Sequence, residues 1–114
     1  MSHPDFAKLA ETVARPLELA IVLPTYNERG NLASLVERLD KALAGIAWEA
    51  IFVDDNSPDG TSDEARKISQ VDRRVRVLHR IGRRGLASAA VEGMMATAAP
   101  VVAAVLVAAF AAPS

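Results

Sequence analysis

The sequence predicts an α/β fold in which helices cover a mostly parallel sheet. Short apolar runs alternate along the chain with stretches of helical periodicity, in the order β-α-β-α-β-α-β. Strands that alternate with helices pair in parallel through right-handed crossovers. A polar, acidic turn follows each of the first two apolar runs. Because ligands of such sheets bind at the carboxyl ends of the strands, both turns are expected at one ligand-binding edge.

The first strand is expected at Leu17–Leu23, an apolar run with β-branched members that ends at Pro24. A helix is expected at Asn31–Ala44, where apolar residues recur with the i, i+3, i+4, i+7 spacing of one helix face. Gly45 stands where such a helix stops. Trp48–Val53 is the second expected strand.

The second half of the chain begins with a polar turn at 54–60 and a short helix through Ala65 and Ile68. Thr61 and Glu64 have the spacing of a capping box, in which each side chain bonds the backbone N–H of the other residue. The remaining expected elements are a strand, a glycine loop, a helix and a strand, at Val75–His79, Gly82–Gly85, Leu86 to about Thr97, and Val101–Val107.

The bulk properties fit one domain, or part of one, with a packed core. The 114 residues are 51% apolar, carry a net charge of −1 and include no cysteine. The charge argues against a nucleic-acid binder, and the absence of cysteine excludes disulfides and thiolate metal sites. Residues 1–17 are expected to be a poorly ordered leader or short helix, and residues 18–110 the domain. The apolar stretch 98–112 is shorter than a membrane-spanning helix requires.

The first acidic turn, PTYNE at 24–28, offers an aromatic ring and a carboxylate above the sheet edge. Tyr26 could stack on a base or pack on a ribose, and Glu28 could accept hydrogen bonds from ribose hydroxyls or base N–H groups. A plain strand-to-helix turn is the alternative. Asn27 or Asn31 would then be the N-cap, and Glu28 would complement the helix dipole.

The second acidic turn places Asp54 and Asp55 at the end of a buried strand, where an unpaired carboxylate is costly. Side chains alternate along a strand, so the two should point in different directions, one toward the local backbone and one toward the ligand edge. Capping of the turn and helix is one alternative. A Mg²⁺ pair, as in a response-regulator receiver, is another, but a receiver also needs an Asp ending the third strand and a later Lys. Here that strand ends with His79 and Arg80, and the last Lys is Lys67.

The arginines between 73 and 84 form a basic segment whose default interpretation is a solvated face. Three of them lie in the loop at the ligand edge and are candidates for phosphate binding: Arg80, Arg83 and Arg84. The two histidines, His3 and His79, have no partners at ligand spacing and receive no role.

Three motifs support a family resemblance: LPTYNERGNL at 23–32, VDDNSPDGT at 53–61 and RRGLASA at 83–89. In this order they resemble the opening signatures of dolichol- and polyprenyl-phosphate mannosyltransferases, which are family 2 glycosyltransferases. The resemblance implies a three-layer GT-A, Rossmann-like nucleotide-binding half domain. It also implies a nucleotide-sugar donor, typically GDP-mannose, a polyprenyl- or dolichyl-phosphate acceptor, and a place in the cytoplasm, peripheral at the membrane face.

Carried over by position, the resemblance assigns nucleotide contacts to five residues: Pro24, Tyr26, Glu28, Val53 and Asp55. Asp55 would recognise the base, and Tyr26 and Glu28 would line the nucleoside pocket. Asp54 would be structural. The resemblance does not identify catalytic residues in this chain.

The chain departs from the family at its fourth strand, which should lead into an Asp-x-Asp motif that binds Mg²⁺ or Mn²⁺. Residues 101–110 read VVAAVLVAAF, and no acidic residue follows Glu92, so the sequence offers no metal ligands there. We therefore expect a truncated and inactive member of the family that exposes apolar surface and self-associates through it. A non-catalytic nucleotide-binding or interaction module is the alternative. A separate chain that completes the domain is a third possibility.

Overall fold

The computed structural model describes residues 16–81 and 85–105. Their centre is a four-stranded parallel sheet with the strand order β3-β2-β1-β4. The strands are β1 (Leu19–Thr25), β2 (Trp48–Asp54), β3 (Val75–His79) and β4 (Val101–Ala104). The predicted parallel α/β arrangement is therefore confirmed. The expected leader (apart from residues 16 and 17) and the end of the expected fourth strand lie outside the described residues.

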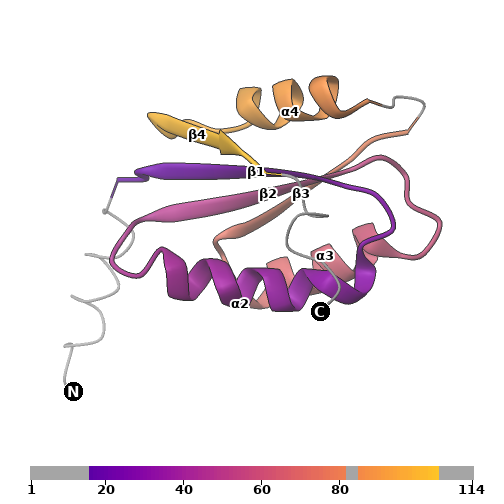
Figure 1. Ribbon diagram of the computed structural model, residues 1–114, viewed down its shortest axis with the longest axis horizontal. Helices are drawn as coiled ribbons and strands as arrows, with labels where there is room; N and C mark the ends of the chain where they lie inside the picture. The colour runs from indigo at the N-terminus through magenta and orange to yellow at the C-terminus, as the bar shows by residue number, and fades with distance from the viewer. Residues whose placement is uncertain (1–15, 82–84, 106–114) are drawn as a thin grey trace, which may run out of the picture.

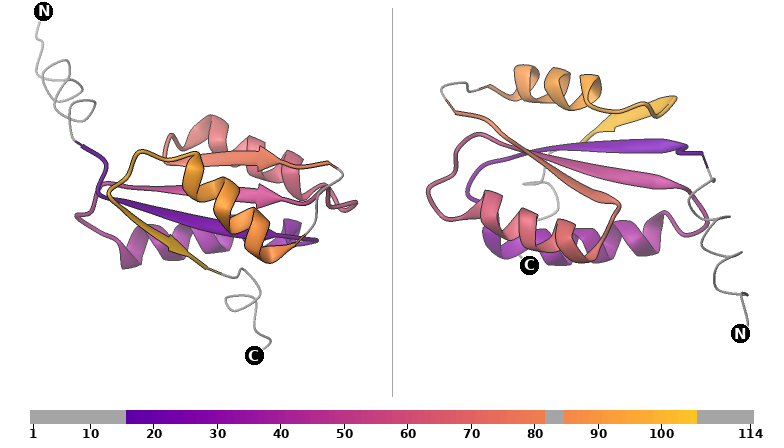
Figure 2. Two further views of the ribbon diagram at one scale, coloured as in Figure 1. Left: turned by 90° about the horizontal axis from the view of Figure 1, so that it is seen from above. Right: turned by 180° about the vertical axis from the view of Figure 1, so that it is seen from behind.

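Helices lie on both faces of the sheet and give three layers (Figures 1 and 2). Two helices, α2 (Leu32–Ala42) and α3 (Thr61–Val71), cover one face. The third, α4 (Leu86–Met95), covers the other. A short 3-10 turn, η1 (Arg29–Asn31), precedes α2.

The core is divided between the two faces because successive strand residues point to opposite sides. In β1, Ile21 and Leu23 join the larger cluster under α2 and α3, whereas Val22 joins the smaller cluster under α4. In β2, Phe52 and Val53 are divided in the same way. Both central strands are thus buried on both faces, which accounts for their nearly continuous apolar sequence.

The expected end of the first strand at Pro24 is wrong, since β1 continues through Pro24 to Thr25. A proline interrupts a strand where its missing N–H is needed by a neighbour. Pro24 follows Val22 by two positions and therefore faces the same neighbour, β4, as Val22 does. The paired register of β1 and β4 covers only Leu19–Val22, so no described residue of β4 needs that N–H.

The expected capping box at Thr61 and Glu64 is also wrong. The N-cap of α3 is Gly60, whose φ of 87° lies in the left-handed region that glycine adopts readily, and no side chain caps the helix from there. Asp59 already accepts a hydrogen bond from the Thr61 N–H at 3.0 Å. The Glu64 N–H donates to the Gly60 carbonyl at 3.0 Å. The helix start is therefore satisfied from outside the expected pair.

Apolar side chains are exposed around α4 and β4. Val91, Met94 and Met95 of α4 and Val101 of β4 are all exposed, and β4 forms an edge of the sheet. The exposed apolar surface expected from the sequence is therefore present. Within the described ranges, no helix has the length and apolar character needed to cross a membrane.

We expect Gly93→Ala to destabilise the fold, because α4 meets the sheet closely at this residue. A Cβ on Gly93 would lie 2.2 Å from Cγ1 of the buried Val22. Overpacking of this kind typically costs about 1–3 kcal/mol of unfolding free energy, which urea denaturation measures. Gly30→Ala is the control, since nothing lies within 4 Å of its Cβ position. Equal unfolding midpoints for the two variants would contradict the tight contact.

Candidate functional site

The two acidic turns lie side by side at the carboxyl edge of the sheet, as the sequence predicts. They follow the last residues of neighbouring strands, Thr25 of β1 and Asp54 of β2, which are directly paired in the parallel register. The Asp55 N–H also donates to the Thr25 carbonyl at 3.4 Å. Each turn contains an asparagine in the left-handed region, Asn27 and Asn56, both with a φ of 54°. Asparagine tolerates this conformation better than most residues.

Side chains of the second turn bind the backbone of the first turn. Three consecutive N–H groups of the first turn donate to side chains of the second or of the helix start behind it: Asn27 to Ser57 Oγ at 2.9 Å, Glu28 to Thr61 Oγ1 at 3.0 Å, and Arg29 to Asp59 Oδ2 at 3.3 Å. These contacts join residues about 30 positions apart in the sequence. The path of the first turn is therefore set by the polar side chains of the second.

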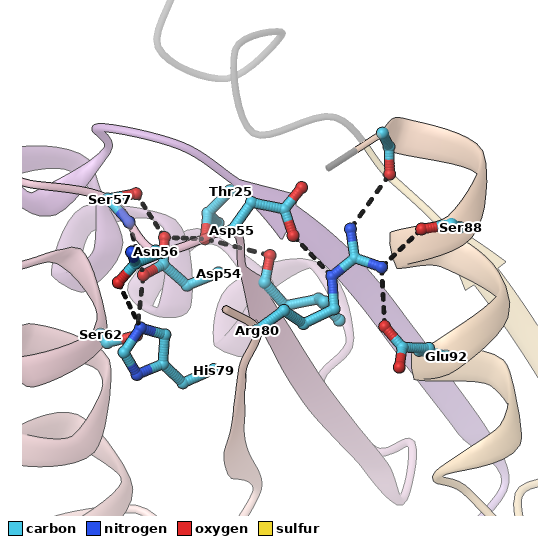
Figure 3. A network of polar contacts seen from close by, with 12 residues as sticks. Thr25, Asp54, Asp55, Asn56, Ser57, Ser62, His79, Arg80, Ser88 and Glu92 are labelled. Atoms are coloured by element: carbon cyan, nitrogen blue, oxygen red, sulfur yellow. Dashed lines mark hydrogen bonds and ion pairs between the residues drawn. The ribbon is translucent and has the colours of Figure 1, made fainter. Parts of the chain in front are cut away.

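Asp54 supports this contact from below the surface. Its side chain is fully buried, and its two carboxyl oxygens are surrounded by neutral donors (Figure 3). Oδ2 accepts from the Ser57 N–H at 3.2 Å and from Ser62 Oγ at 2.7 Å. Oδ1 accepts from Ser57 Oγ, and Thr25 Oγ1 lies 3.5 Å from it. Asp54 thus orients the same hydroxyl that binds the Asn27 N–H, in agreement with the structural role expected for it.

Asp59 makes a second, similar link. The Thr61 hydroxyl accepts from the Glu28 N–H and donates to Asp59 Oδ1. Desolvation alone would raise the pKa of the Asp59 carboxyl. Hydrogen bonds from the Thr61 hydroxyl and from the N–H groups of Arg29 and Thr61 outweigh it and lower the pKa. The acidic residues of the second turn other than Asp55 are therefore engaged in shaping the two turns.

Asp55 points away from this network, as strand alternation predicts. Its Oδ1 accepts a hydrogen bond from Arg80 Nε at 2.6 Å, and its side chain retains 15% exposure. The other carboxyl oxygen points away from Arg80 (Figure 3). Within the described part of the chain, no hydrogen-bond donor contacts that second oxygen. Asp55 therefore combines a firmly held oxygen with one that faces outward.

The expectation of a solvated or phosphate-binding Arg80 is corrected by the structure. Its side chain is only 5% exposed, and its guanidinium binds groups of the protein. Besides Asp55, the partners lie on α4 or at its N-cap: Ser88 Oγ at 2.6 Å, Glu92 Oε2 at 2.7 Å and the Gly85 carbonyl at 3.2 Å. The hydrogen bond to Asp55 outweighs desolvation and raises the pKa of Arg80. The two other phosphate candidates, Arg83 and Arg84, lie outside the described residues.

The Arg80 network was missed at the sequence level, although part of its signal was present. Ser88 and Glu92 are four positions apart, so they lie on one face of α4 and can meet one partner. A hollow of about 260 Å³ lies beside the network and is lined by His79, Arg80, Ile81 and Glu92. His79 Nε2 is 3.0 Å from Asn56 Oδ1, so this histidine contacts the second turn.

The other four predicted contact residues are placed differently from one another. Tyr26 is exposed on the first turn, with 43% of its surface accessible. Glu28 is half-buried, and its Oε2 accepts from Asn31 Nδ2 at 2.8 Å. Pro24 is half-buried within β1, and Val53 is fully buried in the core beneath the turn. The side chain of Val53 therefore supports the turn, and its contact with a nucleotide stays a prediction.

The alternative interpretation of the first turn is realised in part. Asn31 occupies the N-cap position of α2, but its side chain makes no capping hydrogen bond. Its amide instead binds Glu28, as described above. The first turn therefore leads into α2 as expected, but no described side chain caps that helix.

The described residues do not fit a divalent metal. Across residues 16–81 and 85–105, no three His, Cys, Asp or Glu side chains lie together as a metal site. Asp54 and Asp55 point apart, and hydroxyls already surround Asp54. The adjacent pair therefore does not form the acidic pocket of a Mg²⁺ site.

Comparisons with known proteins match this chain to one group of enzymes. The chain is 42% identical over 77 residues to a dolichol-phosphate mannosyltransferase of Pyrococcus furiosus, a match covering 68% of this chain and 22% of the relative. It is 39% identical over 83 residues to a polyprenol monophosphomannose synthase of Mycolicibacterium smegmatis, covering 72% and 31%. The chain therefore spans less than a third of the length of these relatives.

A solved structure shares the fold. A mannosyltransferase from Pyrobaculum calidifontis, in complex with GDP-Man and Mn²⁺, superposes with a TM-score of 0.57 at 18% identity. The match covers 82% of this chain and 31% of the other. The sequence pattern of Glycosyl transferase family 2 matches residues 20–105. Because this match covers most of the chain, including both acidic turns and Arg80, the chain belongs to glycosyl transferase family 2.

Proposed function

We propose that this chain is the nucleotide-binding part of a hexosyltransferase that moves mannose from GDP-mannose to a polyprenyl or dolichyl phosphate. The observation that carries the proposal is Asp55, a partly exposed carboxylate held by Arg80 beside the first turn at the carboxyl edge of the sheet. The named activities of the relatives from Pyrococcus furiosus and Mycolicibacterium smegmatis support it.

The chemistry of the site suits a nucleoside with N–H donors on its base. The outward oxygen of Asp55 is an acceptor, and the Watson–Crick edge of guanine carries adjacent N–H donors. The exposed ring of Tyr26 offers a surface for stacking. Glu28, held by Asn31, offers carboxyl oxygens to ribose hydroxyls. Pro24 and Val53 shape the strand ends below these groups.

The transfer step needs more than the described residues supply. When bound, Mg²⁺ or Mn²⁺ supports departure of the diphosphate in this family, but no described cluster fits such an ion. We infer that these 114 residues bind the nucleotide without transferring the sugar. We also propose that the protein lies in the cytoplasm, peripheral at the membrane face, where it would reach a lipid-phosphate acceptor.

A non-catalytic nucleotide-binding or interaction module is the second candidate. The exposed apolar side chains on α4 and β4 favour it, because patches of this kind mark interaction surfaces. Among the described residues β4 is an edge strand, and such a strand offers backbone groups for pairing with another chain. We propose that the chain self-associates there.

Calorimetric titration with GDP should detect binding that does not require a metal. Asp55→Asn should weaken it by at least about tenfold, because the amide oxygen would face Arg80 and the amide NH₂ would meet the N–H donors of the base. Asp63→Asn is the matched control, since it removes the same charge from an exposed position on α3. Equal affinities for the two variants, or no binding by the unaltered chain, would contradict nucleotide recognition by Asp55.

Incubation with GDP-mannose, Mn²⁺ and a polyprenyl phosphate should give no mannosylated lipid, because the described residues provide no site for the metal. Chromatography of radiolabelled lipid products measures the transfer. Clear turnover would overturn the proposed inactivity and would leave the nucleotide-binding proposal intact.

Sedimentation velocity should show concentration-dependent association of the chain. Val101→Lys places a charge on the open edge strand and should shift the distribution toward monomer. Val71→Lys is the control, because Val71 is more exposed still but lies on α3, away from this surface. A monodisperse monomer at all concentrations would count against self-association.

A further inference from the structure

The guanidinium of Arg80 links the second acidic turn to α4. On one side Nε binds Asp55 Oδ1 at 2.6 Å, at the end of β2. On the other side the Nη groups bind Ser88, Glu92 and the Gly85 carbonyl, which belong to α4 and its start. The Arg80 N–H donates to the Asp54 carbonyl at 2.8 Å. The rigid fork of N–H groups lets one guanidinium bind partners on both sides.

We propose that Arg80 is a positioning residue that sets the base selectivity of the site through Asp55. This inference rests on the proposed function. Arg80 occupies Oδ1 of Asp55 and leaves the second carboxyl oxygen pointing outward (Figure 3). A carboxylate free to rotate could turn either oxygen toward solvent or toward neighbouring donors. With one oxygen bound, the other presents a fixed acceptor to the ligand.

A fixed acceptor discriminates among bases by their hydrogen-bonding edges. Guanine presents two adjacent N–H donors, and uracil presents one between two carbonyl oxygens. Adenine presents a ring nitrogen acceptor beside its amino group. That nitrogen would face the Asp55 oxygen, and two acceptors repel each other. The expected order of affinity is therefore GDP, then UDP, then ADP. A site built to hydrogen-bond one edge binds ligands that lack it more weakly, because its polar group would be left unpaired.

A purely structural role for Arg80 is the competing explanation, since the same side chain ties α4 to the sheet. Two variants separate the roles. Ser88→Ala removes one hydrogen bond on the α4 side and leaves the bond to Asp55 intact. Arg76→Gln removes the same charge four positions earlier, within β3, where Arg76 is exposed and pairs with Glu49. Both should keep the GDP affinity and the preference for GDP over ADP.

The test is a double-mutant cycle between Arg80→Gln and Asp55→Asn, with GDP and ADP as the titrated ligands. Arg80→Gln should lower the affinity for GDP by about tenfold or more and change the affinity for ADP little. The reason is that guanine, unlike adenine, donates two hydrogen bonds toward the fixed oxygen of Asp55. The double variant should bind GDP no more weakly than Asp55→Asn alone. Circular dichroism confirms folding, and Arg80→Lys replaces Arg80→Gln in the cycle if the latter does not fold.

The outcomes separate the possible failures. Additive losses in the double variant would overturn the inference, because Arg80 would then act independently of Asp55. An equal loss of GDP selectivity in Ser88→Ala would also overturn it, in favour of a structural role. Absence of GDP binding by the unaltered chain would instead overturn the proposed function, and this inference with it. Without ligand, the ¹⁵N-detected Arg80 Nε–H signal should shift in Asp55→Asn, and an unchanged signal would contradict the bond.

Discussion

The buried carboxyl group of Asp54 is the constraint on which the candidate site depends. A carboxyl group without water is costly unless hydrogen bonds compensate, and here two serines and a threonine surround it. One of these hydroxyls, that of Ser57, is thereby oriented to receive the Asn27 N–H. Burial of one acidic side chain thus sets the path of a turn on the neighbouring strand. The Asp59–Thr61 pair repeats the arrangement for Glu28.

Two adjacent aspartates serve different purposes because a strand turns successive side chains to opposite sides. Asp54 is directed inward and organises the turns, whereas Asp55 is directed toward Arg80 and the open edge. Arg80 lies between two carboxylates, Asp55 and Glu92, so one buried positive charge is shared by two negative ones. The edge therefore remains rich in acceptors, which suits a base with N–H donors better than it suits a free phosphate.

In the proposed enzyme, nucleoside recognition and metal binding depend on different residues. The described residues contain the turns and the carboxylate proposed to recognise a nucleoside. They do not contain a cluster that fits a divalent metal. One group of exposed apolar residues lies on α4, which packs over β1 and β2, and on the edge strand β4 beside β1. In this proposal, nucleoside recognition depends on the turns that follow β1 and β2.

Local sequence patterns were sufficient to predict the order of the elements, the limits of β3 and the positions of both acidic turns. Periodicity and turn residues act over a few positions, so they can be read along one chain. The strand order and the continuation of β1 through Pro24 depended on neighbours distant in sequence. Arg80 is the clearest case. Its burial and its role follow from Asp55, 25 positions earlier, and Glu92, 12 positions later, which only the folded sheet and helix bring to one guanidinium.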